Sequence, residues 1–227
     1  MPIRTLFILF LMGLNGSGIH AQAPAWQWVR SGNGNFEEEA YALTTTPTGQ
    51  IIIGGEFYSA TLNLGSITLT NPSGSPFSSC AFIAAYDSQG NLLWAKKAGT
   101  SDPNRILSLT SDTAGNIIAA GAFMGSTISF DNFTLTNAGY SDAFVVKYDS
   151  TGQVRWALSI GGPSWEYAQS VATDSAGNIY LTGRFESPDL TLGSFTLTNA
   201  GSGESDVFLV KLSPQGQVLW AYSFGGA

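Results

Sequence analysis

The sequence is short of the side chains that most active sites use. It contains one histidine, His20, and one cysteine, Cys80, in 227 residues. A single cysteine excludes an intramolecular disulfide, and a single histidine leaves too few ligands for an ordinary zinc site. Because His20 lies in an N-terminal segment that we expect to be removed, the mature chain has no histidine base and no His-based triad. We therefore expect a non-enzymatic protein with no catalytic residue, no metal and no cofactor.

Charge is also scarce. Charged residues make up 11% of the chain, against about 25% in a typical domain. Nine basic residues face sixteen acidic ones, which gives a net charge of −7, and Lys and Arg form no cluster. This balance argues against nucleic acid or an anionic membrane as a partner. Polarity comes instead from Ser, Thr, Asn and Gly, a composition typical of extracellular all-β proteins with many turns.

Long hydrophobic runs are absent except near the N-terminus. Arg4 precedes an apolar run from Leu6 to Leu14, which is too short to span a bilayer. A small, polar stretch follows, and this pattern indicates a secretory signal peptide over residues 1–21. We favour cleavage after Ala21 over cleavage after Ala23, which would leave proline at the new terminus. An uncleaved anchor is the alternative.

What the chain has in quantity is repetition. Four tryptophans are spaced 66, 62 and 64 residues apart, and this period determines the architecture. They are Trp28, Trp94, Trp156 and Trp220.

Six short segments share one turn pattern. Each begins with Asp, Ser or Thr, and each has glycine in its fourth position, where a left-handed backbone costs little. They cover residues 46–49, 87–90, 112–115, 149–152, 174–177 and 213–216. A type I turn followed by such a glycine is a common hairpin loop. Calcium binding is the alternative, but calcium loops need several clustered carboxylates, and these turns have at most one aspartate each.

The flanks of these turns are rich in β-branched and aromatic residues and predict strands. Each unit therefore contains two hairpins, with an extra hairpin between them at 62–71, 128–137 and 190–199. Four-stranded units at a fixed period are propeller blades. We predict an all-β fold of three four-stranded antiparallel β-propeller blades in an open arc. The boundaries are 22–39 for an N-terminal strand and loop, and 40–99, 100–161 and 162–227 for the blades.

The third unit carries a recognisable pattern. From Trp156 to Trp220 it reads W-A-x-x-x-G-G, then A-x-S-V-A-T-D-x-A-G-N-I-Y-L-T-G-x-F, then S-D-x-F-x-V-K. This resembles the SBBP type of bacterial β-propeller repeat, found in secreted and surface proteins, and the resemblance covers residues 26–227. It implies a fold and no activity. The first unit departs from the pattern, since Cys80 stands where Asp142 and Asp206 stand later.

A second resemblance concerns residues 85–94, which are similar to the repeat of quinoprotein dehydrogenases. This stretch is one residue short between Asp87 and Gly90, and the basic and metal-binding residues of a quinone site cannot be placed. The similarity therefore gives no reason to expect a quinone cofactor.

Candidate binding residues lie in the connections that vary between units, because variable loops on a rigid scaffold commonly bind ligands. Trp165, Glu166 and Tyr167 predict an aromatic-plus-carboxylate patch that stacks on a sugar, with packing of Trp165 over a blade edge as the alternative. The acidic run 37–39 is interpreted as a solvated loop rather than a cation site. A glycoside hydrolase is the enzymatic alternative, and its carboxylates would come from Glu37, Asp102 and Glu166.

The expected function is binding of a glycan or a protein by a secreted or surface-exposed scaffold, with a structural surface-layer element as another alternative. Three blades do not close a ring of 4–8, and Trp26–Arg30 has the pattern of a fourth strand without its blade. We expect either a longer native chain that supplies more blades or an arc that self-associates through its edges. The resemblance to Bacteroidetes-like surface proteins implies a Gram-negative source and type IX secretion.

Overall fold

The computed structural model describes residues 27–73, 75–99, 102–201 and 203–226, and every regular element within them is a β-strand. The signal segment expected at 1–21, with His20, lies outside these residues. The first unit contains β1 (Glu38–Thr45), β2 (Ile51–Phe57), β3 (Thr61–Leu64), β4 (Ile67–Thr70), β5 (Cys80–Tyr86) and β6 (Leu92–Ala98). The second contains β7 (Asn104–Ser111), β8 (Ile117–Phe123), β9 (Thr127–Phe130), β10 (Phe133–Thr136), β11 (Asp142–Tyr148) and β12 (Val154–Ile160). The third contains β13 (Glu166–Thr173), β14 (Ile179–Phe185), β15 (Asp189–Leu192), β16 (Phe195–Thr198), β17 (Asp206–Leu212) and β18 (Val218–Phe224).

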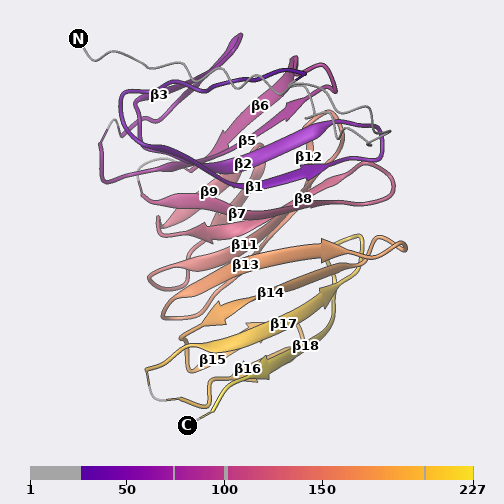
Figure 1. Ribbon diagram of the computed structural model, residues 1–227. Helices are drawn as coiled ribbons and strands as arrows, with labels where there is room; N and C mark the ends of the chain where they lie inside the picture. Colours follow the sequence, from indigo (N-terminus) through magenta and orange to yellow (C-terminus); the bar gives the residue numbers. More distant parts are fainter. Residues whose placement is uncertain (1–26, 74, 100–101, 202, 227) are drawn as a thin grey trace, which may run out of the picture.

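Each unit forms one blade, a four-stranded antiparallel sheet. The strand orders are β1-β2-β5-β6, β7-β8-β11-β12 and β13-β14-β17-β18, and the other two strands of each unit form a separate hairpin. Figure 1 shows the three blades following one another from the indigo end to the yellow end without returning to close a ring. The predicted all-β fold, with three four-stranded blades in an open arc, is thus confirmed. No helix that could cross a membrane occurs among the described residues.

In all six predicted turns the glycine in the fourth position adopts the left-handed backbone conformation. Their fourth positions lie at φ between 77° and 84°. In the turn that begins at Asp174, the carboxylate Oδ1 accepts backbone N–H bonds from Ala176 and Asn178, both at 2.9 Å. The side chain of Asn178 also donates to Asp174 Oδ2 at 2.8 Å. These hydrogen bonds account for the aspartates without calcium, and they lower the pKa of Asp174 below its usual value.

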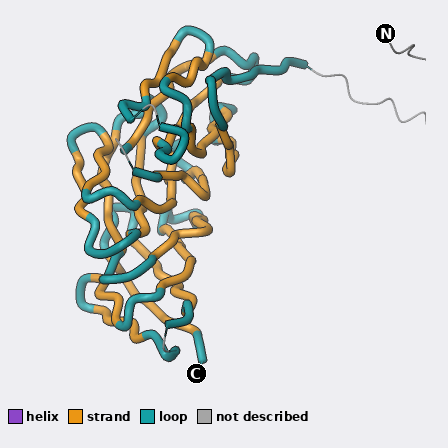
Figure 2. The backbone as a smooth tube through the Cα atoms, turned by 90° about the vertical axis from the view of Figure 1, so that its left-hand side faces the viewer, coloured by secondary structure: helices purple, strands orange, loops and turns teal. Residues whose placement is uncertain are grey.

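Two of the three hydrophobic clusters lie between consecutive blades, and the third lies between the sheet of the first blade and its β3–β4 hairpin. At the first joint, Ile52 and Ile83 of the first blade pack in one cluster with Ile106 and Phe144 of the second. A corresponding cluster joins the second and third blades. In the view of Figure 2, turned by 90°, the strands again follow one another along the length of the molecule without closing a ring. A chain of stacked blades leaves two outer blade faces that no other blade covers.

The N-terminal segment departs from its prediction. Trp26 lies outside the described residues, and residues 27–32 form no strand, although Asn33 makes an isolated bridge to Asn63. A strand needs a hydrogen-bonded neighbour, and the sheet of the first blade ends at β1 and β6. The segment lies across the face of this blade instead, where the Trp28 indole donates to Ser88 O at 3.0 Å and Arg30 donates to Gly90 O at 2.8 Å.

Candidate functional site

The variable connections are held together by backbone hydrogen bonds. The segment that leads into β13 lies beside the one that leads into β11, and Ser141 and Trp165 form a short parallel bridge. Glu166 N donates to Ser141 O at 2.8 Å, and Glu186 N donates to Trp165 O at 3.0 Å. The joint between the first two blades repeats both bonds, from Asn104 N to Ser79 O and from Met124 N to Pro103 O. The backbone of these connections therefore has the same hydrogen-bonded frame at both joints, while the side chains on the frame differ from one joint to the other.

At the joint between the second and third blades this frame carries an aromatic ladder, which we define as Tyr140, Trp165, Tyr167 and Arg184. The Tyr140 and Trp165 rings are stacked with centroids 5.7 Å apart and planes at 13°. The Trp165 and Tyr167 rings are 6.4 Å apart with planes at 2°. The Arg184 guanidinium carbon lies 4.6 Å from the centre of the Tyr167 ring. Four flat groups from separate connections and strands thus form one row.

The ladder is accessible at both ends. Tyr140 is 65% exposed, and Arg184 is an exposed residue of β14. Trp165 and Tyr167 are half-buried between them. The cation–π contact of Arg184 with Tyr167 favours one orientation of its guanidinium group while leaving N–H donors for a ligand. An exposed row of rings that ends in a cation suits a flat or ring-shaped polar ligand.

Glu166 does not belong to this surface. It is fully buried, and its carboxylate accepts backbone N–H bonds from Gly162 at 2.8 Å and from Ser187 at 3.2 Å. Its side chain therefore stabilises the loops around Gly162 and Ser187 and is not accessible to a ligand in solvent. The predicted aromatic-plus-carboxylate patch is corrected accordingly: Trp165 and Tyr167 share a surface, and the third aromatic partner is Tyr140. That tyrosine is 25 residues from Trp165 in the sequence, and nothing in the sequence linked them.

The aspartate that begins the third long strand of the later blades is also structural. Asp142 is buried, and it accepts hydrogen bonds from Ala138 N at 3.1 Å and from the Ser159 hydroxyl at 2.9 Å. Burial raises the pKa of Asp142, and the nearby Glu166 carboxylate raises it further. In the first blade Cys80 takes this place, buried, with its thiol 3.6 Å from Gly99 O. Burial raises the pKa of this thiol, which favours its protonated form.

Sequence reasoning missed one group of polar residues between the first two blades. Glu56 is 1% exposed and accepts hydrogen bonds from the Tyr41 hydroxyl at 2.6 Å and from the Ser79 hydroxyl. The same Tyr41 hydroxyl lies within hydrogen-bond distance of Glu39, so its single hydrogen is shared between the two carboxylates. The Arg105 guanidinium nitrogen lies 3.8 Å from Glu56. Burial, together with the bonds to both glutamates, raises the pKa of Tyr41. The two carboxylates that share a donor are thus Glu39 and Glu56, whereas Glu37 and Asp102 are exposed loop residues.

Metal binding has no support in the described residues, which hold no group of three or more His, Cys, Asp or Glu side chains able to share an ion. The side chains of the aromatic ladder are three aromatic rings and a guanidinium group.

Two known proteins match the sequence over about 150 residues. An uncharacterised WD repeat-containing protein of Acanthamoeba polyphaga mimivirus is 28% identical over 160 residues, which are 63% of this chain and 12% of that protein. The regulatory protein FlaEY of Caulobacter vibrioides is 31% identical over 150 residues, which are 64% of this chain and 16% of that protein. The chain thus spans less than a fifth of the length of either relative.

No family model matches the chain. A crystal structure of a protein of unknown function from Bacteroides caccae aligns over 82% of both chains with 11% identity, but its TM-score of 0.29 is too low to establish a shared fold. The three repeated blades and the match to a WD repeat-containing protein place this chain among repeat scaffolds of the β-propeller type.

Proposed function

We propose that the protein is a non-enzymatic binding scaffold and that its aromatic ladder binds a glycan. The observation that carries this proposal is the stack of Tyr140, Trp165 and Tyr167, which ends in Arg184 on an exposed surface. Aromatic rings offer large, rigid contact area at low cost in conformational entropy. The apolar face of a sugar ring packs on the exposed face of Tyr140, and the guanidinium group of Arg184 donates to sugar oxygens.

The position of the ladder supports the same interpretation. The equivalent frame at the first joint carries Pro103 and Arg105 where the second carries Trp165 and Tyr167. The aromatic side chains are therefore not required to build the frame, since an equivalent frame forms without them. Their presence at one joint is most simply explained by a ligand.

Replacing Trp165 by alanine is expected to weaken glycan binding at least tenfold, which corresponds to about 1.4 kcal/mol. The variant removes the central ring and both stacking contacts but leaves the backbone bonds of the frame. The binding partner is first identified on a glycan array, and affinities are then measured by calorimetry. Phe77→Ala is the matched control, because Phe77 is an 86% exposed aromatic residue before β5 of the first blade. Its binding should equal that of the unaltered protein.

An array without hits, combined with detected hydrolysis of a polysaccharide, would reverse this assignment in favour of an enzyme. In that case Glu39 and Glu56 are the pair to replace, because they share the Tyr41 hydroxyl. Unchanged affinity of Trp165→Ala for an identified glycan would instead move the site away from the ladder.

We propose further that the protein is exported to the surface or surroundings of a Gram-negative bacterium, as the SBBP-type resemblance implies. Arg4 and the apolar run Leu6–Leu14 support a cleaved signal peptide. N-terminal sequencing of the exported protein is expected to begin at Gln22. A mature form that retains residues 1–21 would contradict this proposal.

A further inference from the structure

Consecutive blades are joined by the same tryptophan contact. The indole of Trp94 at the end of the first blade donates to Ser150 O at 3.2 Å, in the last turn of the second blade. Trp156 of the second blade donates to Pro214 O of the third at 3.1 Å. In both contacts the ring lies over the turn glycine; a Cβ placed on Gly152, for example, would be 2.7 Å from the Trp94 ring. Each blade thus offers an indole on one face and a turn on the other.

Trp220 is the third such indole, and no turn of the described chain receives it. It lies in β18 on the outer face of the third blade, beside Tyr180 and Tyr222. We call this surface the trailing face and define it by Tyr180, Arg184, Val207, Trp220, Tyr222 and Phe224. Val207, Tyr222 and Phe224 are 46%, 57% and 55% exposed. At the corresponding positions of the second blade, Ala143 and Ile160 are 0% and 1% exposed because the third blade covers them.

The opposite outer surface carries the matching turn. We call it the leading face and define it by Leu43, Ile51, Tyr86, Ser88 and Gly90 of the first blade. Its turn at Ser88 and Gly90 is already contacted by Trp28, whose ring takes the position that Trp94 and Trp156 take at the joints. This face therefore accepts an indole in the same way as the other two blades do.

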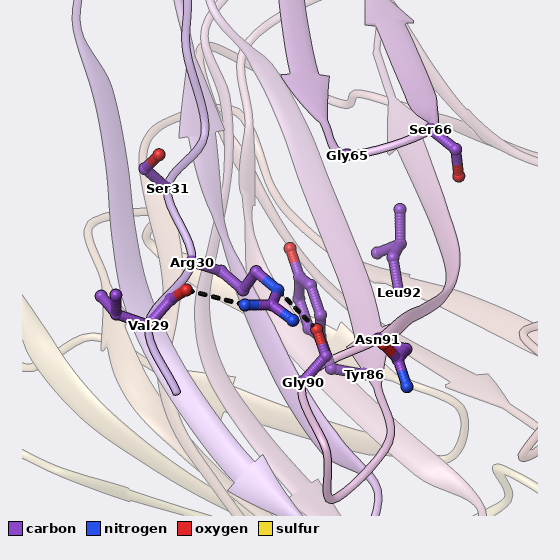
Figure 3. Close-up of a pocket in the computed structure, with 9 residues that line it drawn as sticks. All are labelled: Val29, Arg30, Ser31, Gly65, Ser66, Tyr86, Gly90, Asn91 and Leu92. Carbon is purple, nitrogen blue, oxygen red and sulfur yellow. Dashed lines mark hydrogen bonds between the residues drawn. The ribbon is translucent and has the colours of Figure 1, made fainter. Parts of the chain in front are cut away.

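The N-terminal segment covers the leading face only in part. A hollow of about 470 Å³ lies beside Val29, Arg30 and Tyr86 (Figure 3). A second hollow of about 190 Å³ is lined by Leu43, Ile51 and other residues of this face. Leu43 remains 66% exposed, whereas Leu109, its counterpart in the second blade, is 8% exposed. The leading face is thus covered by the N-terminal segment and by the β3–β4 hairpin, whose Leu62 and Leu64 pack in one cluster with Tyr86, rather than by another blade.

Two charged positions of the outer blades match the ion pair of the first joint in strand register. At the first joint, Glu56 of the first blade pairs with Arg105 of the second. The strand registers show that Arg184 holds the place of Glu56 in the third blade and that Glu39 holds the place of Arg105 in the first. A third blade that docks on a first blade therefore brings Arg184 toward Glu39, which is the internal ion pair with its signs exchanged.

We propose that a second copy of this chain docks head to tail, with its trailing face on the leading face of the first copy. Trp220 displaces Trp28 from the turn at Ser88 and Gly90. Arg184 turns from Tyr167 toward Glu39, which leaves Tyr41, so the glycan-binding surface of the dimer consists of the three stacked rings Tyr140, Trp165 and Tyr167 without the guanidinium group. The contact is heterologous, and it closes when the second copy repeats it. Two copies of three blades make a ring of six, within the range of 4–8 blades in closed propellers.

The test is the oligomeric state of the 227-residue chain without its signal segment, measured by light scattering from about 1 to about 100 µM, a range that covers moderate affinities. We expect a dimer for the unaltered protein. Arg184→Glu alone and Glu39→Arg alone are expected to be monomers, because each places like charges at both contacts of the ring. An equimolar mixture of the two variants should regain the dimer. In that mixed pair one contact joins the two substituted side chains, which carry opposite charges, and the other joins the native Arg184 to the native Glu39.

Two further variants separate this interface from nonspecific association. Trp220→Ala should weaken the dimer at least tenfold, whereas Trp28→Ala vacates the receiving turn and should leave the dimer intact or strengthen it. Circular dichroism checks that each variant is folded. A monomeric unaltered protein throughout the range overturns the proposal and leaves the trailing face to a further blade of a longer chain. A dimer that persists in both charge variants also overturns it.

Discussion

Replacing Asp112 by alanine is expected to destabilise the protein by about 3–5 kcal/mol, because it leaves a buried ammonium group without its partner. Lys147 Nζ lies 2.9 Å from Asp112 Oδ2, and the two side chains are 8% and 5% exposed. The same carboxylate accepts backbone N–H bonds from Ala114 and Asn116, at 3.0 and 2.9 Å. One substitution therefore removes an ion pair and a turn cap together.

The charged state of Asp112 also makes this pair sensitive to acid. Burial by itself would raise the pKa of Asp112, but the hydrogen bonds from Lys147 and Asn116 outweigh it and hold the pKa below its usual value. A carboxyl group whose pKa is lower in the folded state contributes stability above its unfolded pKa, and this contribution is lost as the pH falls through the folded pKa. The difference between Asp112→Ala and the unaltered protein should accordingly shrink at acidic pH.

The third blade supplies a matched control. Asp174 caps the equivalent turn, but its oxygen lies 3.9 Å from Lys211 Nζ, and the Lys211 and Asp174 side chains are 22% and 32% exposed. Asp174→Ala should cause a much smaller loss than Asp112→Ala, because water replaces the lost partner. The free energy of unfolding is measured by urea denaturation. Lys147→Met in the Asp112→Ala background should recover part of the lost stability. Equal losses of stability in Asp112→Ala and Asp174→Ala would contradict this explanation.

Local rules were enough to predict most of the fold. The six turns follow from an acceptor side chain in the first position and glycine in the fourth, and every one of these glycines has positive φ. The period of the tryptophans predicted the blades because Trp94 and Trp156 make the same contact at successive joints. Because the turns and the tryptophans recur in every unit, each occurrence strengthens the prediction of the same structure at the others.

The candidate site was predicted only in part because it depends on contacts between loops. Trp165 and Tyr167 were identified from an aromatic cluster in a variable connection. The burial of Glu166 could not be read from the sequence, since it results from the amides of Gly162 and Ser187 facing the carboxylate. Tyr140 was missed because its stacking on Trp165 depends on two connections lying side by side.

The prediction for residues 26–30 shows a different limit. Their pattern matches that of a fourth strand, and Trp28 does contact the turn that such a strand contacts. Strand formation, however, requires backbone partners, which a side-chain pattern does not supply. For residues 27–30 the pattern therefore predicted a strand that the structure does not contain.

Every blade has a glycine at the same place in its second long strand. Between its first and second strands each blade has a bulge, which in the second blade lies between Ile106 and Ser108. It brings the Arg105 carbonyl oxygen over Gly121, where a Cβ would lie 1.9 Å from that oxygen and 2.9 Å from the Phe144 ring. Gly55 and Gly183 are equally close to the corresponding carbonyls, at 1.8 Å in both blades.

Gly121→Ala is therefore expected to destabilise the protein by about 3 kcal/mol or more, because the obstacle is backbone within a sheet and cannot move aside as a side chain can. Gly115→Ala in the neighbouring turn is the control. Gly115 has φ of +81° and no atom within 4 Å of a Cβ, so alanine there meets only the cost of a left-handed backbone, about 1–2 kcal/mol. The measurement is the midpoint of urea denaturation of each variant. Gly121→Ala should unfold at a lower urea concentration than Gly115→Ala, or fail to fold. The reverse order would show that the bulge relaxes freely. Such a result would remove the steric reason for glycine at this position in all three blades.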